Sequence, residues 1–317
     1  MCACADELIL SDVQLNRDKD SQIVLNKKHG EYAIHLVDFH IKLPGCLIQI
    51  VSERTEKSFG ITDSIHDDDG DLIVSRSAAN FDKQNQTLNF RIHHAMETHL
   101  ADVGLQVWMG ALGMIDFMLD NVQLFRNKQI LELGAGVGLT GIVAGTLTNK
   151  ITLTDVGENI LGLCEMNYHA NQNILQSPPH CFEIRELNWH KPTSIKSLCI
   201  PKPDIIMACD VIYDNDITNA FFQTLQILLN GDTYTKEGCR PSIVKVYIST
   251  EKRLNFTLED LDITCKEYNH FLCKLSELEN TFQSSLSVQR IDMEDISQFC
   301  QYNQTQQLEI WEIQKQL

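Results

Sequence analysis

The stretch ILELGAGVGLTG, residues 130–141, decides the fold of this chain. It begins as a short apolar run, continues as a turn with glycine at every second position, and ends in small residues that suit the first turn of a helix. Glycine is needed in such a turn when a ligand must approach the backbone more closely than a side chain allows. The stretch therefore predicts a buried strand, a ligand-binding turn and a helix in succession. Glycines placed only for close packing are the alternative interpretation.

The spacing of the glycines indicates the kind of ligand. A dinucleotide-binding turn has the pattern G-x-G-x-x-G, which would need glycine at position 139, where this chain has Leu139. The observed pattern, E-x-G-x-G-x-G, is typical of enzymes that bind S-adenosylmethionine. The carboxylate of Glu132 suits the ammonium of an amino-acid moiety and would repel phosphate. We therefore expect S-adenosylmethionine as cofactor, with contacts from Glu132, Gly134, Ala135, Gly136 and Gly138.

Strand-like and helix-like patterns alternate on both sides of this stretch. Predicted strands cover residues 129–133, 150–154, 182–187, 204–208, 243–249, 285–291 and 307–313. Predicted helices cover residues 108–119, 139–147, 157–171, 217–229 and 258–278. This alternation predicts a mostly parallel sheet with helices on both faces, and a ligand site at the carboxyl ends of the strands.

Polar and aromatic residues follow several of these strands at that edge. Asp155 could accept hydrogen bonds from both hydroxyls of a ribose, or it could cap the next helix. Asn188 and Trp189 could grip an adenine by hydrogen bonding and stacking. For Trp189, and for Trp108 before the glycine turn, an ordinary core or rim position is the alternative interpretation.

The segment PDIIMACDVIYD, residues 203–214, places Asp210 and Tyr213 at the same edge. In enzymes that methylate amino groups, this edge faces the transferred methyl group. Enzymes that methylate nucleic-acid amines carry two prolines between the acidic and the aromatic residue, whereas this chain has Val211 and Ile212 there. The segment therefore favours an aliphatic amine over a flat base, although Asp210 could also be a structural cap. Residues 251–256 either border the acceptor site or form a solvated turn.

Composition narrows the possible partners. The chain has 317 residues and a formal net charge of −17, which disfavours direct binding of nucleic acid and suits a basic protein partner, or serves solubility alone. Its 11 cysteines include no CxxC pair, so we expect neither a zinc site nor a disulfide framework. We find no secretory leader pattern and no apolar run long enough for a membrane span, and we expect a nuclear or cytoplasmic protein.

The first part of the chain has a different pattern. Residues 21–52 and 87–92 look like strands, with a short apolar run at 46–51, and polar residues dominate between them. We expect residues 52–80, which include the acidic run 67–71, to form a mobile loop. A calcium loop would need ligands at Ile65 and Arg76, so calcium is disfavoured and we expect no metal.

These features together resemble the methyltransferase-like family of seven-strand protein-lysine methyltransferases. The resemblance covers about residues 96–317 and is carried by residues 107–108, 131–139, Asp155, 188–189 and 210–213. It implies a Rossmann-like α/β fold with a seven-stranded, mostly parallel sheet whose last strand is reversed. Residues 96–317 would form the methyltransferase domain, and residues 1–95 would form an N-terminal β-rich extension.

The resemblance also implies an activity, which is transfer of a methyl group from S-adenosylmethionine to a lysine of one or a few proteins. From the acidic charge we expect the substrate protein to be basic, and we expect the enzyme to be a monomer. Trp108, the glycine turn, Asp155, Trp189 and Cys209 would line the cofactor. We expect Asp210 to orient the amine and Tyr213 to wall its channel. Relatives often have Asp at 188, so the presence of Asn188 weakens the expected side-chain contact with adenine. Relatives often have Ala or Ser at 209, and a backbone contact at Cys209 would survive that change. A methyltransferase for nucleic acids or small molecules, or a scaffold without turnover, are the alternatives.

Overall fold

The computed structural model describes residues 8–13, 22–27, 30–48, 81–82, 84–148, 150–176, 178–191, 194–195, 198, 200–231, 244–257 and 262–315. The predicted mobile loop at residues 52–80, with its acidic run, lies outside the described residues.

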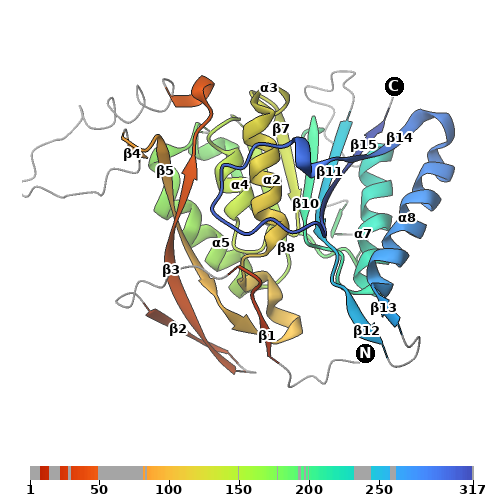
Figure 1. Cartoon of the computed structure of the whole chain (residues 1–317), viewed down its shortest axis with the longest axis horizontal. Coiled ribbons are helices and arrows are strands. Elements are labelled where there is room, and N and C mark those ends of the chain that lie inside the picture. The colour runs from red at the N-terminus through yellow and green to blue at the C-terminus, as the bar shows by residue number, and fades with distance from the viewer. Residues whose placement is uncertain are drawn as a thin grey trace, which may run out of the picture.

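A seven-stranded sheet forms the centre of the molecule (Figure 1). Its strands are β7 (Gln129–Leu133), β8 (Lys150–Asp155), β9 (Phe182–Glu186), β10 (Ile205–Cys209), β11 (Val244–Glu251), β14 (Leu286–Ile291) and β15 (Leu308–Lys315). They lie in the order β14-β15-β11-β10-β7-β8-β9. Strands β7 to β11 pair in parallel, and β15 alone is reversed, because it is antiparallel to both of its neighbours. The predicted fold, including the reversed last strand, is confirmed.

Helices cover both faces of this sheet (Figure 1). One face carries α2 (Met109–Asp120), α4 (Leu139–Ala144) and α5 (Glu158–Asn171), and the other carries α7 (Asn215–Asn230) and α8 (Lys266–Phe282). Because successive side chains of a strand point to opposite faces, Ile130 and Leu131 of β7 belong to two different apolar clusters. The sheet is therefore buried on both sides, as continuous apolar strands predict.

A second sheet lies beside α5. It is antiparallel, in the order β2-β3-β5-β4, and consists of β2 (Gln22–Lys27), β3 (Gly30–Lys42), β4 (Phe81–Asp82) and β5 (Thr87–Ala95). Asn167 and Asn171 of α5 hydrogen-bond to the main chain of β5 at His93 and Arg91, where β4 no longer covers that strand. One apolar cluster includes residues from both sides of position 95, so the predicted extension packs directly against the residues of the central sheet and its helices.

The remaining elements are short. Strands β1 (Ile9–Leu10) and β6 (Glu97–Thr98) pair with each other, as do β12 (Asn255–Thr257) and β13 (Asp262–Thr264). Helix α3 spans Val122–Phe125, and the 3-10 helices are η1 (Leu100–Leu105), η2 (Gln172–Ile174), η3 (Pro179–Cys181), η4 (Gln283–Ser285) and η5 (Met293–Asp295).

Three predicted elements were wrong in part. The helix predicted at 258–278 begins only at Lys266, because the β-branched residues Ile263 and Thr264 pair with β12 instead of continuing a helical pattern. The predicted helix at 139–147 ends at Ala144, before Gly145. In the apolar run at 46–51, residues 46–48 belong to a helical turn, and residues 49–51 lie outside the described residues.

One helical stretch, Leu100–Asp120, is long and apolar enough to span a membrane. In this protein 78% of its most apolar window is buried among the protein's own side chains, as in the core helix of a globular fold.

Candidate active site

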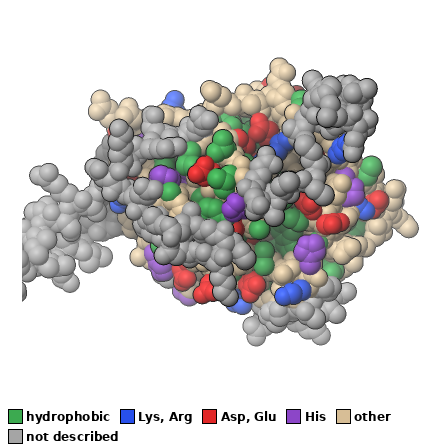
Figure 2. Space-filling model, turned by 90° about the horizontal axis from the view of Figure 1, so that it is seen from below, with side chains coloured by type: hydrophobic (Ala, Val, Ile, Leu, Met, Phe, Trp, Pro, Cys, Tyr) green, Lys and Arg blue, Asp and Glu red, His purple; other side chains and the backbone are tan. Residues whose placement is uncertain are grey.

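A cavity of about 760 Å³ opens at the carboxyl ends of β7, β8, β10 and β11. Figure 2 views this end of the molecule and shows hydrophobic side chains gathered there, with acidic side chains among them. Every residue that the sequence predicted for the site lines this cavity, with the exception of Gly138. The cavity is therefore the place where the predicted cofactor and acceptor residues meet.

The glycine turn forms one wall. Gly134 and Gly136 have φ angles of 70° and 53°, which L-residues rarely adopt. A Cβ atom on Gly136 would lie 2.8 Å from the carbonyl oxygen of Gly104, so no larger residue fits. The amides of Gly134 and Ala135 donate to the carbonyl oxygen of Thr154 at 2.9 and 3.0 Å, which fixes the turn against β8.

Gly138 has a different role from the one predicted. It too has a positive φ angle, 85°, but it precedes α4 and does not border the cavity. A Cβ atom there would lie 2.6 Å from the sulfur of Cys164 on α5. This glycine serves the packing of α4 against α5, which was the alternative interpretation for the turn as a whole.

Glu132 is the buried carboxylate of the site. Its side chain is 1% exposed, and its Oε2 atom has no hydrogen-bond partner. Burial, together with the charge of Asp155, raises the pKa of Glu132 to about 8, although the Gly141 amide and the Thr140 hydroxyl act in the opposite direction. Glu132 lines the cavity, and an acid in this state gains by meeting a cation there.

Asp155 supports the turn from the end of β8. Its Oδ2 atom accepts the amide of Gly136 at 2.7 Å, and its Oδ1 atom accepts the amide of Val156 at 2.7 Å. Burial raises its pKa, and these two hydrogen bonds lower it. The N-cap of α5 is Gly157, without a side-chain cap, so the helix-cap interpretation of Asp155 was wrong.

Two tryptophans flank the turn. Trp189 lies next to Gly134, and its ring meets Phe221 edge-on at 5.3 Å between centroids. The Nε1 atom of Trp108 donates to the carbonyl oxygen of Val103 at 3.0 Å. Both rings therefore lie at the rim of the core and also line the cavity. These positions agree with the core or rim interpretation and leave the rings available to a ligand.

Asn188 is engaged locally. Its Oδ1 atom accepts the amide of His190 at 3.0 Å, and its own amide donates to the hydroxyl of Ser194 at 3.1 Å. The side-chain oxygen thus stabilises a turn beside the cavity. A contact of this side chain with adenine stays a prediction.

Asp210 connects three elements. It follows β10 with a φ angle of 52°, and its Oδ2 atom accepts the amide of Gly110 in the first turn of α2 at 2.5 Å. Its Oδ1 atom accepts the amide of Glu251 at the end of β11 at 2.9 Å. Burial raises its pKa against the opposing effect of Arg253 and of both amides. The structural-cap interpretation therefore holds, and each oxygen keeps a second lone pair for another donor.

Cys209 and Tyr213 complete the predicted set. The Thr140 hydroxyl lies 3.7 Å from the Cys209 sulfur, and burial raises the pKa of this thiol well above its usual range. Tyr213 is half-buried at the cavity, and burial together with the charge of Asp155 raises its pKa. Both side chains are therefore neutral walls at neutral pH.

Sequence patterns missed one charged residue at this end, Asp12, and the structure places Arg253 of the segment 251–256 at the cavity, the first of the two interpretations of that segment. The guanidinium of Arg253 lies over the ring of Trp108 at 4.5 Å and lines the cavity. Asp12 lies 3.9 Å from Arg253 and accepts the amide of Met109 at 3.1 Å. Burial and the charge of Asp210 raise the pKa of Asp12 to about 7. Asp12 belongs to a short terminal segment without a strand pattern, so no sequence signal could have placed it here.

The residues present fit S-adenosylmethionine. The unpaired Glu132 oxygen offers a partner for an ammonium group, and the positive-φ glycines leave room for a ligand against the backbone. Among the residues that the structure describes, no group of three or more His, Cys, Asp or Glu side chains could hold a metal ion.

A parallel sheet with one reversed strand, a glycine turn after its first strand and a strand-end acid on the next define the Rossmann-like methyltransferases. Within this class, a family model described as lysine methyltransferase matches residues 84–256, and the chain belongs to this family. S-adenosylmethionine is the cofactor of the class, and the predicted cofactor and family are confirmed by this match.

Several known proteins are similar to this chain. Methyltransferase-like protein 22 of mouse and of human are 36% and 37% identical to this chain, over 70% of it, and the chain spans only 58% and 57% of their length. In the sequence, residues 251–256 and 67–71 resemble this same relative. Protein N-lysine methyltransferase METTL21A of Danio rerio is 29% identical, over 61% of this chain and 87% of its own. The ribosomal protein L11 methylase structure from Lactobacillus delbrueckii is 14% identical, with a TM-score of 0.35, and covers 66% of this chain and 77% of its own.

Proposed function

We propose that this protein transfers a methyl group from S-adenosylmethionine to the side-chain nitrogen of a lysine in another protein. The observation that supports this most directly is one cavity that brings together the unpaired Glu132 carboxylate, the glycine turn and the Asp210–Tyr213 element. Membership in the lysine methyltransferase family supports the choice of acceptor.

Bound S-adenosylmethionine supplies an electrophilic methyl group on a positively charged sulfur. Glu132 would accept a hydrogen bond from its ammonium group, and Asp155 would accept hydrogen bonds from the ribose hydroxyls with the lone pairs that the Gly136 and Val156 amides leave free. Trp108, Asn188 and Trp189 would border the base, and Cys209 would contact the cofactor through its backbone. The glycine turn excludes side chains from the path of the ligand.

Asp210 and Tyr213 act on the acceptor amine. An unperturbed lysine has a pKa of about 10.4, so the site must favour its neutral form. The cavity would do so by removing water from the amine, and the positive sulfur of the bound cofactor would lower the pKa of the amine further. Asp210 orients the amine, because both of its oxygens are held by main-chain amides and cannot swing away. Tyr213 walls the channel as a neutral phenol.

The proposal extends to partners and location. The net charge of −17 favours a basic protein as substrate and disfavours nucleic acid and anionic membrane surfaces. We further propose that the enzyme acts as a monomer in the nucleus or the cytoplasm, with residues 96–317 as the methyltransferase domain and residues 1–95 as its β-rich extension.

The test is transfer of label from tritiated S-adenosylmethionine to a cell lysate, followed by protease or nuclease treatment and by mass spectrometry of the labelled fraction. We expect label that protease removes and that hydrolyses to methyl-lysine. Label that nuclease removes, or that stays with small molecules, contradicts the proposal. Binding of S-adenosylhomocysteine without any labelled product would indicate a scaffold.

A further inference from the structure

Large exposed apolar side chains gather around the mouth of the cavity. In the part of the chain that the structure describes, five such residues lie at this end, each 40–68% exposed: Leu8, Leu10, Leu100, Val156 and Leu254. Leu124 on α3 and Met166 on α5 are exposed elsewhere. A contiguous exposed apolar patch marks an interaction site far more often than scattered apolar residues do.

The terminal segment Leu8–Val13, here called the strap, supplies two of these residues. Within it the side chains alternate, so that Ile9 lines the cavity while Leu8 and Leu10 face solvent. The Ser11 amide donates to the carbonyl oxygen of Met96 at 2.8 Å, and its hydroxyl donates to that of Val107 at 2.7 Å. The strap is therefore held in place, and its two leucines form a fixed surface.

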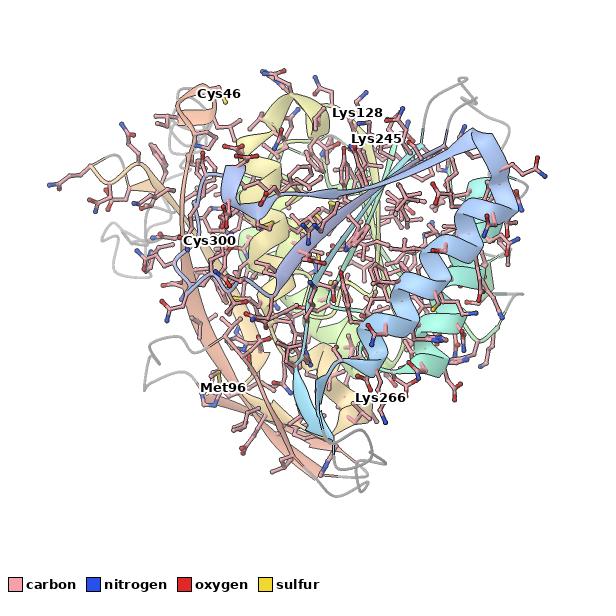
Figure 3. The ribbon with its side chains drawn as sticks, turned by 45° about the vertical axis from the view of Figure 1, so that its right-hand side comes forward. Cys46, Met96, Lys128, Lys245, Lys266 and Cys300 are labelled. Carbon is pink, nitrogen blue, oxygen red and sulfur yellow. The ribbon has the colours of Figure 1, made fainter. Side chains whose placement is uncertain are left out.

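The other three residues border the cavity directly. Leu100 and Val156 line it, and Leu254 follows Arg253, which also lines it. Met96, beside the strap, and Lys266, at the cavity, lie at the same end of the molecule, whereas Lys128 and Lys245 lie at the opposite end (Figure 3). The five residues thus surround one opening, although they come from four separate parts of the sequence.

Acidic groups lie between this apolar rim and the cavity floor. Asp155, Asp210, Glu251 and Glu267 line the cavity, against Arg253 and Lys266, and Asp12 of the strap lies beside Arg253. The excess of carboxylates suits a single incoming cation. The five rim side chains are apolar, so they provide no partner for further charged side chains. A purely basic segment would leave the five apolar side chains exposed to water.

We propose that Leu8, Leu10, Leu100, Val156 and Leu254 are the docking rim for the substrate protein, and that they select a lysine flanked by large apolar residues. This inference rests on the proposed function, because it assumes that the occupant of the cavity is a lysine side chain. The strap gives the N-terminal segment a defined part in substrate recognition.

The test uses short capped peptides with a fixed central lysine and randomised neighbours, and compares the full-length protein with the double variant Leu10→Ser/Leu254→Ser. We expect the wild type to methylate peptides with Leu, Ile or Phe beside the lysine preferentially. The double variant should lower kcat/KM for these peptides about tenfold, because two apolar contacts are lost. The matched control Leu124→Ser, an exposed leucine at the far end of the molecule, should leave it unchanged.

Affinity for S-adenosylhomocysteine and the thermal midpoint verify that each variant is folded and binds cofactor. An absence of apolar preference, a preference for Arg or Lys neighbours, or equal peptide methylation by the double variant and the wild type overturns the docking rim and leaves the proposed function standing. If lysate proteins are labelled but no peptide is, the same variants are compared on lysate, where equal labelling overturns the rim and weaker labelling by the double variant supports it. If neither peptides nor lysate proteins are labelled while S-adenosylhomocysteine binds, the proposed function itself fails, and the rim with it.

Discussion

At the scale of single residues, the three carboxylates that the sequence predicted for the site differ in how their oxygens are satisfied. Asp155 and Asp210 each accept two main-chain amides, one per oxygen. Glu132 retains an oxygen without a partner although it is almost fully buried. Because a buried ionised group without a partner is costly, Glu132 gains most from a bound cation.

Binding of S-adenosylmethionine should therefore depend on pH through Glu132. Its pKa of about 8 means that the acid is largely protonated at neutral pH in the free protein, and a cationic ligand favours the ionised form. We expect affinity to rise as pH increases toward about 8, by up to about tenfold per pH unit, and to stop rising there, because the α-ammonium of the ligand loses its own proton at about 7.7–8.0. Calorimetric titration across this range measures the effect.

The variant Glu132→Gln serves as the control for this pH dependence. It should bind S-adenosylmethionine more weakly and with a flat pH profile in this window. The variant Asp155→Asn separates the contribution of the second acid whose pKa is raised. A profile in Glu132→Gln as steep as in the wild type would assign the proton to another group.

Asp210→Ala should affect stability and catalysis together. Removal of the carboxylate leaves the buried amides of Gly110 and Glu251 without acceptors, which costs about 1–3 kcal/mol of unfolding free energy for each unsatisfied group. We expect lysine methylation to be lost while S-adenosylhomocysteine still binds to the folded protein. Urea denaturation and calorimetry measure the two effects. Loss of cofactor binding in a folded variant would contradict the assignment of Asp210 to the acceptor.

At the scale of elements, the glycine turn depends on close approach between two segments. Gly136 lies against the carbonyl oxygen of Gly104 in η1, and the amide of Gly136 donates a hydrogen bond to Asp155 at the end of β8. Asn167 of α5 donates to the carbonyl oxygens of both Val137 and His93, at 2.9 Å each. The turn is thus fixed by β8, α5 and the second sheet together.

Gly136→Ala should damage the turn beyond the cost of its backbone conformation. The matched control is Gly231→Ala, whose φ angle of 84° is also positive but whose added methyl group would meet nothing within 4 Å. We expect the control to lose about 1 kcal/mol of stability with unchanged cofactor affinity. Gly136→Ala should lose more stability and bind S-adenosylhomocysteine at least about tenfold more weakly. Equal cofactor affinity in the two variants would show that the turn tolerates displacement.

At the scale of the whole molecule, the fold gathers acids at one end of the sheet and buries them. Burial raises the pKa of Glu132 and Asp12 to about 8 and about 7, and raises those of Asp155 and Asp210 as well. In the unfolded chain these groups titrate near 4. Between the two values the folded protein binds more protons than the unfolded chain does.

The free protein should therefore become more stable as pH falls from about 8 toward about 6. Each group contributes at most about 1.4 kcal/mol per pH unit, since folding takes up the proton that the unfolded chain has lost. The same acidification lowers the repulsion within a chain of net charge −17. Denaturation midpoints in urea at several pH values measure the slope. Glu132→Gln should reduce it, and an unchanged slope in that variant would assign the effect to the other acids and the net charge.

The alternation of strands and helices determined the central sheet, because a buried strand needs a continuous apolar run and each crossover helix needs an apolar face. The glycine spacing and the strand-end residues placed Glu132, Asp155 and Asp210 at one cavity for the same reason, since parallel strands end at one edge. Local patterns failed where distant pairing overrides them, as at Ile263 and Thr264, and where one glycine packs between helices, as at Gly138.

The sequence by itself thus determined the class of fold, the cofactor and the strand-end residues of the cavity lining, because these depend on patterns within single elements. Only the tertiary structure decided that the strap brings Asp12 and two leucines to the cavity, that Arg253 stacks on Trp108, and that Asp210 joins α2 to β11. Those contacts connect segments far apart in the chain, and no local periodicity records which distant partners a folded chain brings together.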